Sequence, residues 1–334
     1  MFNSQDFAYP LKIVPYLLNF SNIFLCNPYF IRHNIKDNKY EVCSFWAQKV
    51  VVGVFQILRM SSVILKVLGI FSRKETGLLL LLLIALYASW LLFNTSVIYV
   101  LWFQQHSLVQ FLNLGKKVCH QVALPVTAAR RKIAFIIAVA LPFMLFGWSI
   151  LDIFRTKRDY TRFYEDIRTD IFEISADILY QDIRNSSRTG TNQTFVFQRN
   201  FTTLDYMVGF VHEVVLLQAS FILHLGFAIC MSVSFVCWFI VKDFMTCVRT
   251  RYGYGNLPKV LDILDDLHDV LGVCSTSLGL LFCEVTLLYV PMYAMHLPLI
   301  ASNDVIDVTQ LFLFLSCVSL SLMPAGDVHS MVKS

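Results

Sequence analysis

Four ionisable side chains lie inside strongly apolar stretches of the sequence, and their types could support chemistry. They are His212, Glu213, His224 and Glu284. Groups of this kind are costly in a lipid bilayer and usually face the interior of a helix bundle or a water-filled cavity. The two histidines are not four residues apart, so they lack the spacing of a zinc-binding HExxH helix. Glu284 stands alone on its segment, between Cys283 and Val285.

Two apolar segments also carry aromatic and polar side chains along one face. The residues are Tyr206, Phe210 and Glu213 in the first segment, and Tyr289, Tyr293 and His296 in the second. An aromatic-lined cleft with a few polar groups is a common way to hold a small molecule. We expect these six residues, together with Trp148, to form a ligand-binding site near the outer face of a membrane. The alternative is that the same stripes are aromatic belts or helix-packing surfaces.

The sequence shows no recognisable motif for catalysis. It contains no P-loop, no GxSxG, no HExxH and no glycine-rich dinucleotide-binding turn. Its nine cysteines form no CxxC pair and no Cys/His metal spacing, so we expect reduced thiols packed in apolar segments. We therefore expect neither an enzyme nor a bound metal or cofactor.

Composition indicates a protein embedded in a membrane. Apolar residues make up 57% of the 334 residues, charged residues make up 15%, and the mean hydropathy is +0.61. Soluble globular proteins have roughly 45–50% apolar and about 25% charged residues. The net charge of +4 is too small to indicate a nucleic-acid partner. The expected partner is the lipid bilayer.

Six segments are apolar enough to be membrane-spanning helices, which need about 20 residues each. They comprise residues 42–71, 77–103, 133–151, 204–241, 277–300 and 307–323. The fourth has 38 residues without proline, and we interpret it as one long helix that projects beyond the bilayer. In the first, Lys49 and Lys66 can lie near the ends, whereas Arg59 is expected to face other helices. The predicted fold class is all-α, a polytopic membrane helical bundle with six helices present.

Glycosylation acceptor patterns predict the orientation of this bundle across the membrane. Asn-x-Ser/Thr begins at Asn185, Asn192 and Asn200, within the loop 152–203. Because sugars are added only on the lumenal side, this loop is expected outside. The loop 104–132 carries Lys116, Lys117, Arg130, Arg131 and Lys132, as cytoplasmic loops do. An apolar stripe in the outer loop predicts a helix that caps the bundle or, alternatively, a lid that gathers ligand.

The predicted membrane topology divides the chain into five parts. They are a cytoplasmic segment (1–41), helices one to three (42–151), the extracellular loop (152–203), helices four to six (204–323) and a cytoplasmic approach to a further helix (324–334). A cytoplasmic amphipathic helix is expected near 258–272. Its apolar stripe of Val260, Leu264, Leu267 and Leu271 indicates packing against a neighbouring helix or subunit. Its aspartates are interpreted as a solvated face and not as a metal site.

Two stretches near the C-terminal end resemble a known family. They are "LPKVLDILDDLHDVLGVCSTSLGLLF" and "LFLFLSCVSLSLMPAGDVHSMVKS". With six apolar helices, a cytoplasmic N-terminus and an over-long fourth helix, the chain is similar to the gustatory receptors of insects and crustaceans, which are seven-transmembrane chemoreceptors. The likeness covers most of the chain in layout, and in local pattern the part from Leu257 onward.

The resemblance implies a ligand-gated cation channel in the plasma membrane, assembled as a homo- or hetero-tetramer and opened by a small-molecule tastant. It implies a pocket that opens outward, where the stripes at Tyr206 and Tyr289 fall. The signature of the family, Thr-Tyr…Gln-Phe in a pore-lining seventh helix, is not reached before Ser334. The expectation is an incomplete sequence or a truncated form that cannot conduct alone.

Two other classes of membrane protein are the alternatives. A receptor coupled to G proteins is disfavoured by the inward N-terminus, by the lack of Asp-Arg-Tyr after the third helix and by the lack of cysteine in the loop 152–203. A small-solute transporter commonly shows internal repeats or paired broken helices, and neither is found in the sequence.

Overall fold

Helices dominate the structure, a computed structural model that describes residues 9–72, 78–122, 128–156, 203–252, 256–300, 309, 312–313 and 315–323. The helices are α1 (Tyr9–Ile23), α2 (Trp46–Ser72), α3 (Leu78–Phe103), α4 (Gln105–Val122), α5 (Ala128–Thr156), α8 (Thr203–Cys247) and α9 (Leu257–Ile300), and a π-helical turn, η2 (Val248–Tyr252), follows α8. One antiparallel hairpin joins β1 (Phe30–Asn34) to β2 (Lys39–Cys43). The predicted all-α class is confirmed apart from this hairpin.

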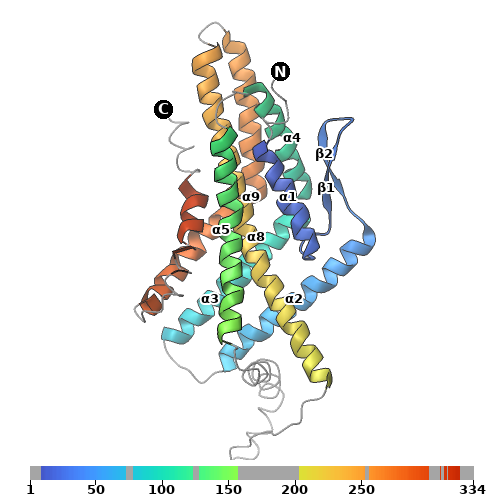
Figure 1. Ribbon diagram of the computed structural model, residues 1–334, viewed down its shortest axis with the longest axis vertical. Helices are drawn as coiled ribbons and strands as arrows, with labels where there is room; N and C mark the ends of the chain where they lie inside the picture. The colour runs from blue at the N-terminus through green and yellow to red at the C-terminus, as the bar shows by residue number, and fades with distance from the viewer. Residues whose placement is uncertain are drawn as a thin grey trace, which may run out of the picture.

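The longest helix, α8, forms the axis of the bundle (Figure 1). It packs against α1, α2, α3, α4 and α5. Its middle part is apolar on every side and buried, which is the sequence pattern of a helix surrounded by others. At 45 residues it is about 67 Å long. The prediction of one long helix in this region is confirmed.

Helices α3 and α8 approach each other closely at Gly226. A Cβ atom placed on Gly226 would lie 2.6 Å from Cγ2 of Val97 and 2.8 Å from Cε1 of Phe93, both on α3. Small residues permit such close crossings of helices in apolar surroundings. The absence of a side chain at Gly226 therefore sets how α3 packs on the axis.

The segment 1–41, predicted only as a cytoplasmic N-terminal segment, contains α1 and most of the hairpin. The register pairs Phe30 with Cys43, so the first predicted spanning segment begins later than expected, at Trp46 of α2. The side chain of Asn113 on α4 holds the backbone of the hairpin at Tyr40. Asn113 accepts a hydrogen bond from the Tyr40 amide at 2.7 Å and donates one to the Tyr40 carbonyl at 3.1 Å.

The predicted loop 104–132 contains α4, a helix of 18 residues. Its buried residues recur at helical spacing: Leu108, Phe111, Leu112, Gly115, Val118 and Val122. A bend at Gln104 separates α4 from α3. The basic residues Lys116 and Lys117 remain on the opposite, partly exposed face, so the segment is amphipathic and not a loop.

The predicted amphipathic helix and the predicted fifth span are a single helix, α9, of 44 residues. No proline lies between the two parts, and Ile263, Leu267, Val270 and Cys274 are buried as α9 packs against α4. The apolar stripe was therefore predicted one position off. Leu267 is buried, but Leu264 is exposed.

Two helical stretches among the described residues are long and apolar enough to cross a membrane, Leu217–Thr250 and Leu257–Val285. Two more apolar stretches, Leu91–Phe103 and Ile133–Trp148, are shorter in the part whose side chains are described. The first of these four is almost entirely buried, as the core helix of a soluble protein also is. By length and composition alone, the described residues thus give two candidate spans where six are predicted.

Candidate functional site

The seven residues predicted to bind a ligand all lie on described helices, but the side chains of five of them lie outside the described part of the structure. Those five are Tyr206, Glu213, Tyr289, Tyr293 and His296. Phe210 is exposed on the first turns of α8. The indole N–H of Trp148 on α5 is buried and has no partner among the described residues. The predicted site therefore stays a prediction.

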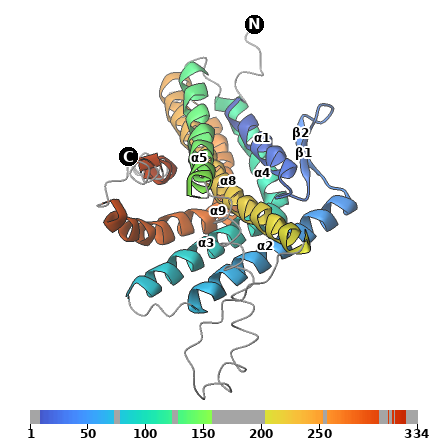
Figure 2. The same cartoon turned by 60° about the horizontal axis from the view of Figure 1, so that its bottom comes forward.

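The two predicted stripes belong to the first turns of α8 and to the last turns of α9. The first turns of α8 and the last turns of α9 lie on opposite sides of the bundle in both views (Figures 1 and 2). The sequons at Asn185, Asn192 and Asn200 lie outside the described residues.

A buried arginine joins α2 to α3. Arg59 is 1% exposed, and its Nη1 donates a hydrogen bond to Oδ1 of Asn94 at 3.1 Å. Its Nε has no partner among the described residues. The prediction that Arg59 faces other helices is confirmed. A guanidinium in this position is held by a neutral amide and not by a carboxylate.

A second buried polar contact joins α3 to α9. The Oγ of Ser96 donates a hydrogen bond to Oε1 of Glu284 at 2.5 Å. Glu284 therefore does not stand alone, because its partner comes from a distant part of the sequence. Asn94 and Ser96 are two positions apart, about 200° around a helix, so α3 presents one polar group to α2 and the other to α9.

His224, the third of the predicted ionisable groups, has a local partner. Its Nδ1 lies 2.7 Å from the carbonyl oxygen of Ser220, one turn earlier on α8, and its ring packs against Phe146. It is buried. The described part of the chain contains no group of three His, Cys, Asp or Glu side chains that could hold a metal ion.

The turn that follows α1 is inserted into the bundle, and its backbone is satisfied by side chains. Leu25 has a left-handed backbone, with φ of 56°. Its carbonyl accepts hydrogen bonds from Nε2 of Gln56 on α2 at 3.1 Å and from Nε2 of Gln218 on α8 at 3.2 Å. Gln218 also donates to the carbonyl of Phe24 at 2.8 Å. Non-helical backbone is tolerated in an apolar bundle only where protein groups complete its hydrogen bonds, as they do here.

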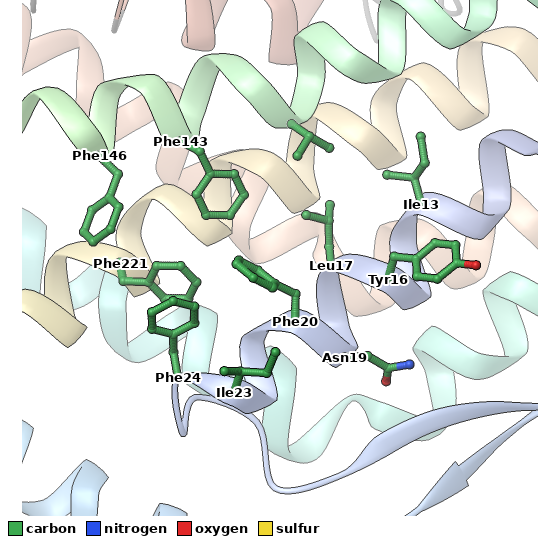
Figure 3. A pocket seen from close by; sticks show the side chains of 11 residues that line it. Ile13, Tyr16, Leu17, Asn19, Phe20, Ile23, Phe24, Phe143, Phe146 and Phe221 are labelled. Atoms are coloured by element: carbon green, nitrogen blue, oxygen red, sulfur yellow. The ribbon is translucent and has the colours of Figure 1, made fainter.

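An aromatic groove of about 800 Å³ runs between α1, α5 and α8 (Figure 3). Phe24 and Phe221 stack with their ring centroids 4.1 Å apart, and Phe20 meets Phe143 edge-on at 5.7 Å. Asn19 lines the groove, but its amide already makes two hydrogen bonds with the backbone of Ile31, of 2.9 and 2.8 Å. Sequence reasoning missed this groove because α1 was not predicted.

Basic side chains gather where α4 meets the hairpin. The Nζ of Lys116 lies 2.9 Å from Nε2 of His33 and donates to the carbonyl and side-chain oxygens of Asn38. Burial and the nearby Lys116 lower the pKa of His33, and burial with the charge of Lys12 lowers the pKa of Lys116. The neighbouring Lys117 forms an ion pair of 2.7 Å with Asp266 of α9.

The chain matches no protein-family model and no curated protein.

Proposed function

We propose that the protein is a multi-pass membrane protein that works as a subunit of a ligand-gated cation channel of the gustatory-receptor type. One observation carries the membrane part of the proposal, namely that polar side chains are buried and apolar ones face outward on α2. Gln56 and Arg59 are buried between helices, whereas Val54, Ile57 and Leu58 are exposed. A soluble protein has the opposite arrangement.

Helix α5 supports the same reading. Its outward residues are Ile133, Ile136, Ile137 and Met144, all exposed, while Phe135, Ala138 and Leu145 pack inward. Large exposed apolar patches are unfavourable in water but are solvated by lipid chains. On this proposal, six spans are formed by α2, α3, α5, α8, the second part of α9 and the segment that ends at Met323.

The positions of the helix ends support the proposed orientation of the bundle across the membrane. Helix α5 ends at Thr156 and α8 begins at Thr203 at one end of the molecule, whereas the helix α4, whose sequence includes Lys116 and Lys117, lies toward the other end (Figure 1). The connecting segment, which carries the sequons, therefore leaves from the end opposite to these basic residues. Basic residues favour the cytoplasmic side.

The choice of a chemosensory channel rests on the resemblance of the layout and of the two C-terminal stretches to gustatory receptors. A long α8 and an α9 with a cytoplasmic amphipathic half fit that layout. A receptor coupled to G proteins and a small-solute transporter are the alternatives, and both would share the membrane bundle. They differ in what a ligand causes, which is a current, a second-messenger signal or uptake.

Whole-cell recording with a panel of sugars, amino acids and bitter alkaloids tests the choice. The channel proposal expects a cation current in cells that express the protein together with any partner subunit it requires. Tyr293→Ala and Glu213→Ala are expected to shift the dose response by about 5- to 150-fold, the effect of losing roughly 1–3 kcal/mol of contact. Phe312→Ala, at an exposed apolar position, is the control at equal surface expression. A second-messenger response without current would favour a receptor coupled to G proteins. Solute uptake without current would favour a transporter.

A further inference from the structure

We propose that Glu284 is a proton-binding site at the centre of the bundle. Its carboxyl group holds a proton at neutral pH while α3 and α9 are packed together, and releases that proton when the two helices separate. The ligand is a proton, so the site needs no cavity. This role goes beyond the proposed function, because it depends on the packing of three helices and not on a tastant or a current.

The carboxyl group lies where three long helices meet. Helices α3, α8 and α9 pack against one another (Figure 1), and the side chain of Glu284 is 6% exposed. Leu281 and Val285, its neighbours on α9, are fully buried. An ionised carboxylate that is removed from water in this way is stable only beside a cation or with several hydrogen-bond donors.

The groups that face Glu284 from the other two helices carry no positive charge. They are the hydroxyl of Ser96 on α3 and, at longer range, the thiol of Cys230 on α8. The buried cation Arg59 is hydrogen-bonded to Asn94, which α3 presents to α2 on its other side. The ion pair found in the described part of the chain joins Lys117 to Asp266. Among the described residues, a negative charge on Glu284 would therefore have no counter-charge.

The hydrogen bonds of Glu284 suit the acid better than the carboxylate. Ser96 donates to Oε1, and Oε2 has no partner among the described residues. A carboxylate that is kept ionised in a protein interior commonly accepts two or three hydrogen bonds. In the protonated group, Oε1 is the carbonyl oxygen that accepts from Ser96, and Oε2 carries the proton. Burial of a neutral oxygen costs far less than burial of a charged one.

The proton is coupled to the packing of α3 on α9. A glutamate in water releases its proton at about pH 4.3, so a movement that admits water to Glu284 releases the proton at neutral pH. By linkage, a rise in pH then favours the separated helices, and a fall in pH favours the packed ones. The Ser96–Glu284 contact would thus respond to pH without any second ligand.

Infrared spectroscopy of the purified protein in detergent at neutral pH detects this proton. A protonated carboxyl group gives a C=O stretching band that is separate from the carboxylate bands and shifts in heavy water. We expect such a band in the wild type and its loss in Glu284→Gln. Glu41→Gln, which changes an exposed carboxyl group of the hairpin, is the matched control and should leave the band unchanged. Ser96→Ala should keep the band to higher pH, because a donated hydrogen bond favours the ionised form.

Equilibrium unfolding between about pH 5 and about pH 8 measures the same proton independently. In this range the unfolded chain has released it and the folded chain keeps it. Each unit of pH should therefore raise the unfolding equilibrium constant of the wild type up to about tenfold relative to that of Glu284→Gln. The comparison with Glu284→Gln cancels His33 and every other group that the two proteins share.

Three results would overturn the assignment of a proton to Glu284. The first is a ratio of unfolding constants that stays constant with pH or changes in the opposite direction, as an ionised Glu284 requires. The second is an infrared difference between the wild type and Glu284→Gln that lies in the carboxylate bands at neutral pH. The third is failure of Glu284→Gln to fold, because glutamine has the shape and the neutrality of the protonated acid. None of these measurements records a current, so each leaves the proposed function to its own test.

Discussion

Ser96 and Glu284 connect α3 to α9 through a hydrogen bond of 2.5 Å from the Ser96 hydroxyl to Oε1 of the carboxyl group. Both side chains are buried, and the other carboxyl oxygen of Glu284 has no partner among the described residues. Among the described residues, this contact is the side-chain hydrogen bond that the buried carboxyl group of Glu284 makes. Substituting Ser96 and substituting Glu284 are therefore expected to change the stability of the protein by different amounts.

Ser96→Ala is expected to destabilise the protein by about 1–3 kcal/mol, because it leaves a buried acceptor without a donor. Glu284→Gln should cost less, since an amide oxygen can still accept the bond. Thr95→Ala is the matched control, because Thr95 is exposed and its hydroxyl donates to the carbonyl of Leu91 in its own helix, with a further weak contact to the sulfur of Met60. The unfolding midpoint of purified protein in detergent measures the difference. Equal midpoints for Ser96→Ala and Thr95→Ala would show that the contact contributes nothing.

The Arg59–Asn94 contact predicts an order of stabilities. Asn94→Ala removes the amide that holds the buried guanidinium and should be more destabilising than Arg59→Met, which removes the charge as well. Adding Arg59→Met to Asn94→Ala should then recover part of the lost stability. Unfolding midpoints of the two single variants and the double variant form the test. Additive losses in the double variant would show that the two residues are not coupled.

Two glycines on long helices predict opposite results. A Cβ at Gly226 would overlap Val97 and Phe93, so Gly226→Ala should separate α3 from α8 and lower the melting temperature. Gly272 of α9 has no atom within 4 Å of the equivalent position, so Gly272→Ala should stabilise by up to about 1 kcal/mol through helix propensity. A melting temperature for Gly226→Ala at or above wild type would contradict the close crossing.

The direction of the bundle predicts where inserted tags can be labelled. A tag at Met1 should be invisible to antibody on intact cells and visible after permeabilisation, because the N-terminus is proposed to be cytoplasmic. A tag at Gly190 should be labelled on intact cells, and its chain should lose mass on treatment with a glycosidase. Labelling of Met1 on intact cells would reverse the orientation and remove the support for the gustatory-receptor type.

The contact between His33 and Lys116 predicts a pH dependence of the hairpin. Because the pKa of His33 is lowered in the folded chain, the fold favours the neutral ring. Stability from this group is present above its ordinary pKa of about 6.5 and falls as the pH drops below that value. The groups that face it are Lys116, Lys12 and Asn38. The melting temperature should fall between about pH 7.5 and about pH 5.5, and His33→Gln should reduce that fall. If the melting temperature of His33→Gln falls as much as that of the wild type, groups other than His33 cause the pH dependence.

The sequence predicted the parts of the fold that depend on a single segment. The 38 residues without proline indicated one helix, because apolarity and length are local properties. The charge of Arg59 predicted that its side chain faces other helices, because an exposed charge in lipid is costly. The hairpin was missed although Asp37 and Asn38 form its turn, because the alternation in each strand is short. Helix α1, which contains Pro15, was not predicted.

Contacts between distant segments could not be predicted from one sequence. Nothing near Glu284 in the chain indicates Ser96, since the pairing depends on how α3 and α9 cross. The aromatic groove likewise requires α1, α5 and α8 to be placed first. The predicted ligand site combines stripes from two distant segments, and one sequence does not say how such segments are placed relative to each other.

The turn after α1 has a consequence for the order in which the protein is made. The carbonyl of Leu25 is synthesised early, but Gln218, which completes its hydrogen bonds, follows 193 residues later. At about 5–20 residues per second, translation leaves this carbonyl without that partner for roughly 10–40 s. During that interval, burial of the turn in lipid would leave backbone groups unsatisfied. The turn after α1 is therefore made well before α8, the helix that completes its hydrogen bonds.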